Sequence, residues 1–220
     1  MILNFHTHSP RKEDGVISFY NADIRNGEKE FTLGDYRCAG IHPWWIDDFD
    51  EESRDKILKT FLSESITCIG EIGLDRSFKS VEFSKQVEFF EFQLKIAIDR
   101  KDKFIIIHCV RAYQEILNSV KKVGYKGVLV FHDYNGNEEM TEKLLGRGDY
   151  FSYGNMLFQK ESKAMNSLSH IPLNRLFIET DDQSRFSIDE AYREASIFLG
   201  IKMDNLSQQS MKNFIYLKNL

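Results

Sequence analysis

Four of the six histidines and two acidic residues stand at or just beyond the ends of short apolar runs in this chain. They are His6, His8, Glu71, His108, His132 and Asp181. Imidazole nitrogen and carboxylate oxygen together bind divalent ions such as Zn²⁺, Mn²⁺, Fe²⁺ or Ni²⁺. His6 and His8 are two residues apart, so on an extended strand both side chains point to the same side. The residue types and their spacing therefore favour a metal site.

The number of these residues favours two ions. Four imidazoles and two carboxylates exceed the needs of one catalytic ion that keeps an open position. In two-metal hydrolytic sites the ions lie about 3.5–4 Å apart, activate water and stabilise a leaving oxygen. Each residue also has a structural interpretation, since a strand-end histidine is often a hydrogen-bonded core residue and a strand-end acid often caps a turn or a helix. One metal centre explains the positions of all six residues, whereas the structural interpretation requires six separate coincidences.

Strands and helices alternate along the chain to position these residues. Eight apolar runs are typical of buried parallel strands, at about residues 2–6, 16–21, 36–41, 66–71, 103–108, 127–132, 149–154 and 175–180. Helical spacing of apolar residues predicts helices at 82–101, 111–123, 137–146, 161–169, 188–199 and over about the last 15 residues. This alternation predicts an α/β fold, a (β/α)8 TIM barrel, as a single domain over residues 1–220.

The barrel is expected to be compact. The chain has 220 residues, whereas about 250 is typical of this fold. Few residues separate the first two runs, and residues 22–35 are polar and contain glycine. We therefore expect one or two early helices to be shortened or missing. In a parallel barrel all strand C-termini open on one face, which is where the six candidate ligands are expected to meet.

Composition limits the classes of partner. The chain carries 34 acidic and 29 basic residues, a net charge of −5, which disfavours non-specific attraction of nucleic acid. Its three cysteines, Cys38, Cys68 and Cys109, are too few for a disulfide framework and fit a reducing compartment. The N-terminus lacks a signal-peptide pattern, and no run approaches the ~20 apolar residues of a membrane span. We expect a cytoplasmic monomer without membrane association.

Six short motifs resemble those of the TatD family of metal-dependent hydrolases. They are His6-Thr7-His8, Gly40-Ile41-His42-Pro43, Gly70-Glu71-Ile72-Gly73-Leu74-Asp75, Ile107-His108, His132, and Ile178-Glu179-Thr180-Asp181. They occur in the family's order and extend to about residue 182. The resemblance implies a TIM barrel of the amidohydrolase superfamily that hydrolyses phosphodiesters as a metal-dependent deoxyribonuclease. Its partner would be single-stranded DNA or another phosphodiester.

The resemblance also implies a role for each ligand. One ion would be held by His6, His8, Glu71 and Asp181, and the second by Glu71, His108 and His132, with Glu71 as the bridge. Asp181 and Glu71 would be the catalytic residues. As a hypothesis for the mechanism, Asp181 accepts the proton of the attacking water. The family descriptions favour Mg²⁺, whereas four imidazoles favour Zn²⁺ or Mn²⁺, so the identity of the two ions stays open.

Other residues are candidates for contact with substrate. His42 and Asp75 would lie near the site and bind phosphate or orient ligands. Arg76 and Arg111 follow strand ends and are candidates for offsetting phosphoryl charge, or are solvated loop residues. The family commonly has an arginine two residues after the fifth-strand histidine, and here Arg111 is three residues after His108. This shift leaves its reach to substrate open.

Two other functions fit the same ligand set. An amidohydrolase or lactonase acting on a small molecule is favoured mildly by the negative net charge and by Asp182, an acid that the family pattern lacks. A catalytically silent barrel could bind metal and serve as an interaction module. Trp44 and Trp45 follow the His42 motif; they either stack a base of a single strand or cover the barrel rim.

Overall fold

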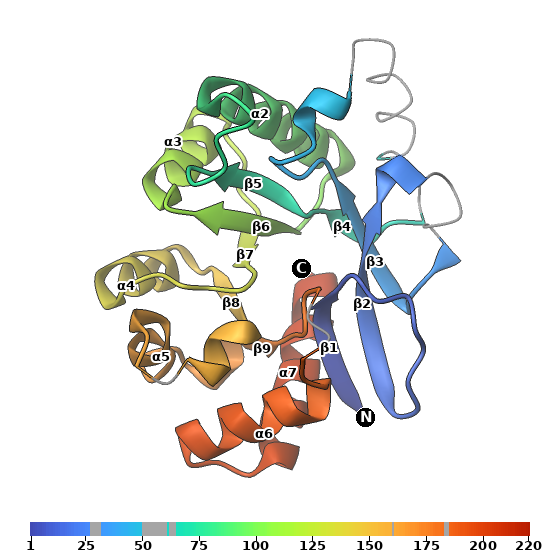
Figure 1. The fold of residues 1–220 in the computed structure, drawn as a ribbon, viewed down its shortest axis with the longest axis vertical. Coiled ribbons are helices and arrows are strands. Elements are labelled where there is room, and N and C mark those ends of the chain that lie inside the picture. Colours follow the sequence, from blue (N-terminus) through green and yellow to red (C-terminus); the bar gives the residue numbers. More distant parts are fainter. Residues whose placement is uncertain (27–31, 50–60, 62–64, 160, 183–184) are drawn as a thin grey trace. The chain divides into compact units, whose positions relative to one another are not determined.

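The computed structural model describes residues 1–26, 32–49, 61, 65–159, 161–182 and 185–220. Within these ranges the chain forms nine strands and six α-helices (Figure 1). The fold divides into two compact units made of interleaved segments. Unit 1 comprises Met1–Tyr20, Gly34–Tyr36 and Val130–Leu220, and unit 2 comprises Asn21–Leu33 and Arg37–Leu129. The prediction of one domain stays a prediction.

Unit 1 is built on parallel strands. β1 (Ile2–Thr7) pairs in parallel with the first part of β2 (Val16–Asp23). β8 (Tyr150–Tyr153) pairs in parallel with the end of β7 (Val128–Phe131) and with β9 (Leu176–Ile178). The four strands β1, β7, β8 and β9 are almost entirely buried, as parallel strands covered on both faces are.

Four helices belong to unit 1: α4 (Glu138–Arg147), α5 (Lys163–Leu168), α6 (Ile188–Leu199) and α7 (Met203–Lys218). The core beneath them is aromatic. Phe5 of β1 stacks on Phe177 of β9 with ring centroids 3.8 Å apart, and it meets Phe214 of α7 edge-on. Fully burying such a side chain contributes about 1.5–3 kcal/mol. These contacts hold β1 beside β9, the two strands that carry His6 and lead to Asp181.

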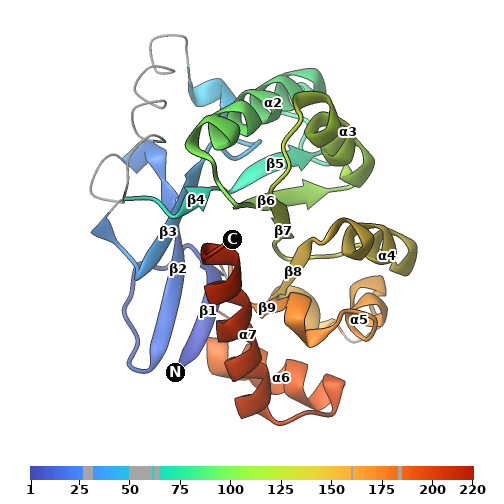
Figure 2. The same cartoon turned by 180° about the vertical axis from the view of Figure 1, so that it is seen from behind.

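Unit 2 contains two more parallel pairs. β3 (Tyr36–Gly40) pairs with β4 (Cys68–Ile69), and β5 (Ile72–Asp75) pairs with β6 (Phe104–Val110). Figure 2 shows α2 (Phe83–Arg100) and α3 (Tyr113–Val123) beside β5 and β6. α2 contacts β5, α3, β4 and the short turn Ile46–Asp48, and α3 also contacts β5 and β6.

Two buried glutamines of α2 hydrogen-bond to the backbone of the segments that carry candidate site residues. Gln93 accepts the N–H of Ile41 at 2.7 Å and donates to the carbonyl of the same residue at 3.0 Å. Gln86 accepts the N–H of Asp75 at 2.8 Å and donates to its carbonyl at 3.1 Å. Because a buried amide that satisfies both backbone groups leaves neither unpaired, each glutamine fixes its loop. The segments around His42 and Asp75 are therefore rigidly attached to α2.

The predicted elements agree with the structure in most places, with two differences. The run predicted as one strand at 66–71 is divided into β4 and β5, with Gly70 and Glu71 between them. The strand predicted at 103–108 continues to Val110, so His108 lies inside β6 and not at its end. Residues 8–15 join β1 to β2 without a helix, as expected. Part of 22–35 lies outside the described residues. None of the described helices is long and apolar enough to cross a membrane.

Candidate metal centre

Unit 1 gathers His6, His132 and Asp181 into one group, named cluster A here. One donor atom from each residue lies within 4.8 Å of the other two. His6 Nε2 is 3.5 Å from Asp181 Oδ1, and the rings of His6 and His132 are 4.4 Å apart. His6 is fully buried, and His132 is 7% exposed. Three donors from β1 and from the residues after β7 and β9 thus converge at one place.

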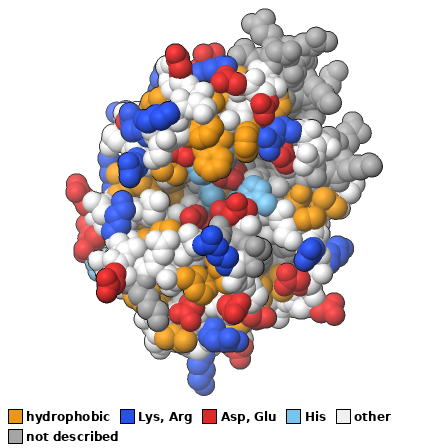
Figure 3. Space-filling model, viewed as in Figure 1, with side chains coloured by type: hydrophobic (Ala, Val, Ile, Leu, Met, Phe, Trp, Pro, Cys, Tyr) orange, Lys and Arg blue, Asp and Glu red, His pale blue; other side chains and the backbone are white. Residues whose placement is uncertain are grey.

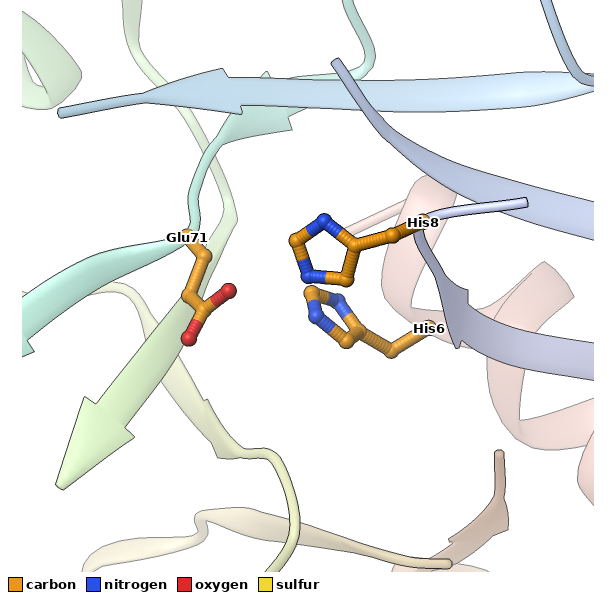
Figure 4. Close-up of side chains that lie close together, drawn as sticks. All are labelled: His6, His8 and Glu71. Carbon is orange, nitrogen blue, oxygen red and sulfur yellow. The ribbon is translucent and has the colours of Figure 1, made fainter. Parts of the chain in front are cut away.

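His8 borders cluster A. Its Nε2 lies 3.4 Å from Asp181 Oδ1, and its side chain is 37% exposed. In Figure 4 the imidazoles of His6 and His8 lie on the same side of β1, as their two-residue spacing predicts. Of the two, only His8 has substantial contact with solvent, so it is the imidazole of this pair that an incoming ligand can reach.

The backbone of Asp181 is fixed against β1. Its N–H donates to the carbonyl of His6 at 3.0 Å, and its own carbonyl accepts the N–H of His8 at 3.1 Å. Its φ of 54° lies in the left-handed region, which aspartate tolerates better than most residues. Arg111 and Asp133 also have positive φ values, 53° and 37°. Arg111 directly follows β6, and Asp133 is the second residue after β7. Such backbone conformations cluster at functional sites.

The buried carboxylate of Glu179 lies next to the ring of His132. Glu179 is fully buried, and its Oε1 lies 3.6 Å from His132 Nδ1 and accepts the N–H of Asp133 at 2.6 Å. Its Oε2 has no hydrogen-bond partner among the described residues. A carboxylate beside the non-ligating nitrogen of a histidine orients the ring in metal sites. Glu179 belongs to the motif Ile178-Glu179-Thr180-Asp181, but no role for it was predicted from the sequence.

Unit 2 gathers His42, Glu71 and His108 into a second group, named cluster B. Their donor atoms also lie within 4.8 Å of one another. Glu71 Oε1 is 2.8 Å from His108 Nδ1 and 3.3 Å from His42 Nε2. Glu71 is 3% exposed and stands between β4 and β5, where Figure 4 draws its carboxylate. Bridging of two ions by Glu71, and substrate binding by His42, stay predictions.

Asn21 of β2 makes two hydrogen bonds to Glu71. Its Nδ2 donates to Glu71 Oε2 at 3.1 Å, and its Oδ1 accepts the N–H of Glu71 at 3.1 Å. Asn21 is 8% exposed, so both bonds are shielded from water. Asn21 could not be identified as a site residue from the sequence, because its position in an apolar strand carries no signal of a contact with a residue 50 positions away.

Asp75 lies between His108 of cluster B and the exposed ring of Trp44. Its Oδ2 accepts the indole N–H of Trp44 at 2.7 Å and lies 3.6 Å from His108 Nε2. Burial acts to raise the pKa of Asp75, but hydrogen bonds from His108, from Trp44 and from the N–H of Ser77 together hold that pKa well below its ordinary value of 3.8. The carboxylate is therefore ionised at neutral pH.

The donor sets of both clusters fit a divalent ion. Atoms that share an ion with bonds of about 2.0–2.2 Å lie roughly 3–4 Å apart, and the donors of each cluster need only a small contraction to reach that spacing. Cluster A offers two imidazoles and a carboxylate, and so does cluster B. Zn²⁺ and Mn²⁺ accept this mixture, and Mg²⁺ accepts it less readily because it prefers oxygen.

A cavity of about 520 Å³ opens beside cluster A within unit 1. His8, Asp181 and Asp182 line it together with Arg11 and Phe186. Small polar side chains line other parts of its wall. Arg11 was not among the sequence candidates, since nothing in its neighbourhood marks it. It brings a cation to the cavity beside the imidazole of His8 and three carboxylates, those of Glu13, Asp181 and Asp182.

The two predicted phosphate-binding arginines lie outside clusters A and B. Arg76 is ion-paired with Glu115, and its Nε donates to the carbonyl of Arg111 at 3.3 Å. Its guanidinium also covers the ring of Phe83 at 4.1 Å. Arg76 therefore has several protein partners already, and substrate binding by Arg76 and Arg111 stays a prediction.

Comparisons with known proteins agree on one family. The family described as TatD related DNase matches residues 20–214. The metal-dependent hydrolase BU355 of Buchnera aphidicola is 32% identical over 176 residues, which cover 76% of this chain and 64% of that protein. The human 3'-5' RNA nuclease TATDN2 is 30% identical over 149 residues, 64% of this chain and 19% of that protein. The chain thus spans less than two thirds of the length of these relatives.

A solved structure shows the same fold. The TatD homologue YjjV of Escherichia coli superposes with a TM-score of 0.82, at 18% identity, over 100% of this chain and 98% of that one. This likeness confirms the predicted fold class, a parallel α/β barrel of the TIM type. The suspected family is confirmed as well.

Proposed function

Because the chain belongs to the TatD related DNase family, we propose that it is a metal-dependent deoxyribonuclease that hydrolyses phosphodiester bonds and uses two divalent ions. One observation carries the proposal. Each unit gathers two imidazoles and a carboxylate whose donor atoms lie within 4.8 Å of one another. The relatives' names support the reaction class, since one is a metal-dependent hydrolase and another an RNA nuclease.

The residues of cluster A and cluster B would each hold one ion, of Mg²⁺, Mn²⁺ or Zn²⁺. Ions bound there would lower the pKa of water and offset the charge of a phosphoryl group. The six predicted ligands, His6, His8, Glu71, His108, His132 and Asp181, all belong to these clusters or border them. His42 adds a seventh donor.

Asp181 is the residue best suited to take up the proton of the attacking water. Its carboxylate is about one fifth exposed, so water reaches it, and its backbone is fixed by two hydrogen bonds to β1. His6 and His8 both approach its Oδ1 and hold that oxygen in place. A positioned carboxylate within hydrogen-bond reach of the water serves as a general base.

The cavity beside cluster A supports a substrate of nucleotide size. Its volume of about 520 Å³ falls in the range of roughly 300–1,000 Å³ that small-molecule sites occupy. Arg11 would pair with a phosphate oxygen there, and the ring of Phe186 offers an apolar wall. This arrangement brings one phosphate of the substrate close to Asp181.

The test is nucleotide release from single-stranded DNA, with RNA as a second substrate. Metal-stripped protein is reloaded with Mg²⁺, Mn²⁺ or Zn²⁺, and Asp181→Asn is compared with Asp204→Asn, which changes an exposed acid of α7. We expect release that depends on metal, falls by orders of magnitude in Asp181→Asn and is unchanged in Asp204→Asn. Absence of release with every ion would contradict the proposal and would direct attention to small phosphoesters, amides and lactones.

A further inference from the structure

We propose that Trp44 and Phe78 form a stacking platform that binds an unstacked base of single-stranded nucleic acid beside cluster B. The inference rests on the proposed nuclease function and names a subsite for its substrate. The two rings are stacked, with centroids 5.4 Å apart and planes 21° from parallel. Trp44 is 39% exposed, and Phe78 is partly exposed. Together they present an aromatic surface to solvent.

One buried carboxylate fixes both members of the platform. Asp75 is 3% exposed; its Oδ2 accepts the indole N–H of Trp44, and its Oδ1 accepts the backbone N–H of Phe78 at 3.1 Å. Asp75 is itself held by Gln86 of α2. The rings are therefore positioned before any ligand binds, which reduces the entropy lost on binding. A tryptophan that only covered a rim would not need this attachment.

The platform lies directly against the candidate ligands of unit 2. The ring centroid of Trp44 is 4.8 Å from that of His42 and 6.0 Å from that of His108, and both imidazoles meet it edge-on. A base stacked at this place brings the phosphate of its own nucleotide close to cluster B.

The charge of the chain explains why stacking is needed. With a net charge of −5, the protein gains little from general attraction to a phosphate backbone. Figure 3 shows basic and acidic side chains interspersed on its face. Base stacking on an aromatic ring is independent of charge and tolerates any sequence, since every base has a π-face. Bases inside a duplex are already stacked, so the platform selects single strands.

Trp45 provides a matched control. It is 37% exposed, close to the value for Trp44, but it lies under the guanidinium of Arg25 at 3.9 Å. Trp44→Leu removes both the ring and the indole N–H, whereas Trp44→Phe keeps an aromatic ring and loses the bond to Asp75. Trp45→Leu removes an equally exposed ring that meets the ring of Trp44 edge-on, with centroids 6.1 Å apart, and leaves the stacked pair of Trp44 and Phe78 in place.

The experiment measures KM for two single-stranded oligodeoxynucleotides, one with bases and one with abasic sites around the cleaved bond, using metal-loaded full-length protein. We expect the wild type to prefer the base-containing strand by about tenfold or more. Trp44→Leu should lose this preference, and Trp44→Phe and Trp45→Leu should keep most of it. Thermal melting confirms that each variant is folded.

Two results would overturn the inference while leaving the nuclease function intact: cleavage of both strands by the wild type with equal KM, or an unchanged preference in folded Trp44→Leu. Failure of the nuclease proposal looks different, because neither strand is then cut by any variant with any ion.

Discussion

Asn21 is the residue whose removal most cleanly tests the geometry of cluster B. Asn21→Ala deletes the donor to Glu71 Oε2 and the acceptor of the Glu71 N–H. The carboxylate then loses its fixed orientation although all three donors, His42, Glu71 and His108, remain. Loss of such an outer partner typically weakens metal affinity 10–100-fold, which corresponds to about 1.4–2.8 kcal/mol.

The assay is calorimetric titration of metal-stripped protein with Mn²⁺. We expect two equivalents for the wild type. In Asn21→Ala one dissociation constant should rise 10–100-fold and the other should change little, since the two bonds that the variant loses hold Glu71, a donor of cluster B.

Asn213→Ala is the control for a general loss of stability. Asn213 of α7 is also buried; its Nδ2 donates to the carbonyls of Leu173 and Leu176 at 2.7 and 3.0 Å, and its Oδ1 accepts from Gln209 at 2.7 Å. Removing bonds of this kind costs about 0.5–1.5 kcal/mol each, and a chain of this size loses about 2–4 °C in Tm per kcal/mol. Both variants should melt earlier, but only Asn21→Ala should bind metal more weakly. Wild-type affinities in Asn21→Ala, or equal weakening in both variants, would refute the reasoning.

Four further outcomes are expected. Glu179→Gln should lower kcat 10–100-fold with little change in KM, because the ring of His132 loses its charged partner; an unchanged kcat by steady-state assay would remove Glu179 from the site. Burial raises the pKa of Cys109 to about 12, so only about one thiol in ten thousand is ionised at pH 8 and iodoacetamide should label it in urea but not in the folded protein. For the same reason the thiol of Cys109 keeps its proton in the folded state at pH values above its ordinary pKa of 9.0, at which the unfolded chain loses that proton. Denaturant melts should therefore show that the free energy of unfolding falls as pH rises from 9 towards 12. Arg11→Ala should raise KM for an oligonucleotide roughly tenfold at nearly constant kcat, whereas Lys12→Ala, whose side chain does not line the cavity, should leave both constants unchanged.

The elements that carry the site could largely be predicted from the sequence, because their signals are local. The apolar spacing in 82–101 corresponds to α2, and the helix predicted at 188–199 corresponds to α6, which the structure shows to begin with a capping box at Ser187 and Glu190. The division of the fourth predicted strand was not foreseen. Gly70 and Glu71 sit inside a continuous apolar run, and only the fold reveals that Glu71 faces His42 and His108 there.

The partners of the ligands could not be predicted, because they depend on contacts distant in sequence. Asn21 meets Glu71 across 50 residues and Glu179 meets His132 across 47, and each is an ordinary residue in its own segment. Gln86 and Gln93 lie within the helix predicted at 82–101, but their bonds to the backbone of Asp75 and Ile41 follow only from the packing of α2. The spacing of residues in the sequence identifies the candidate metal ligands, whereas the residues that orient these ligands are identified only from the tertiary structure.

The central claim is that hydrolysis requires ions at both clusters. The most direct test measures nucleotide release from single-stranded DNA against the number of metal equivalents returned to the stripped protein, for the wild type, His132→Ala in cluster A and His108→Ala in cluster B. We predict that activity rises only as the second equivalent binds, and that each variant binds one equivalent and stays inactive. Full activity in stripped protein held in chelator, or in either variant, would contradict the account.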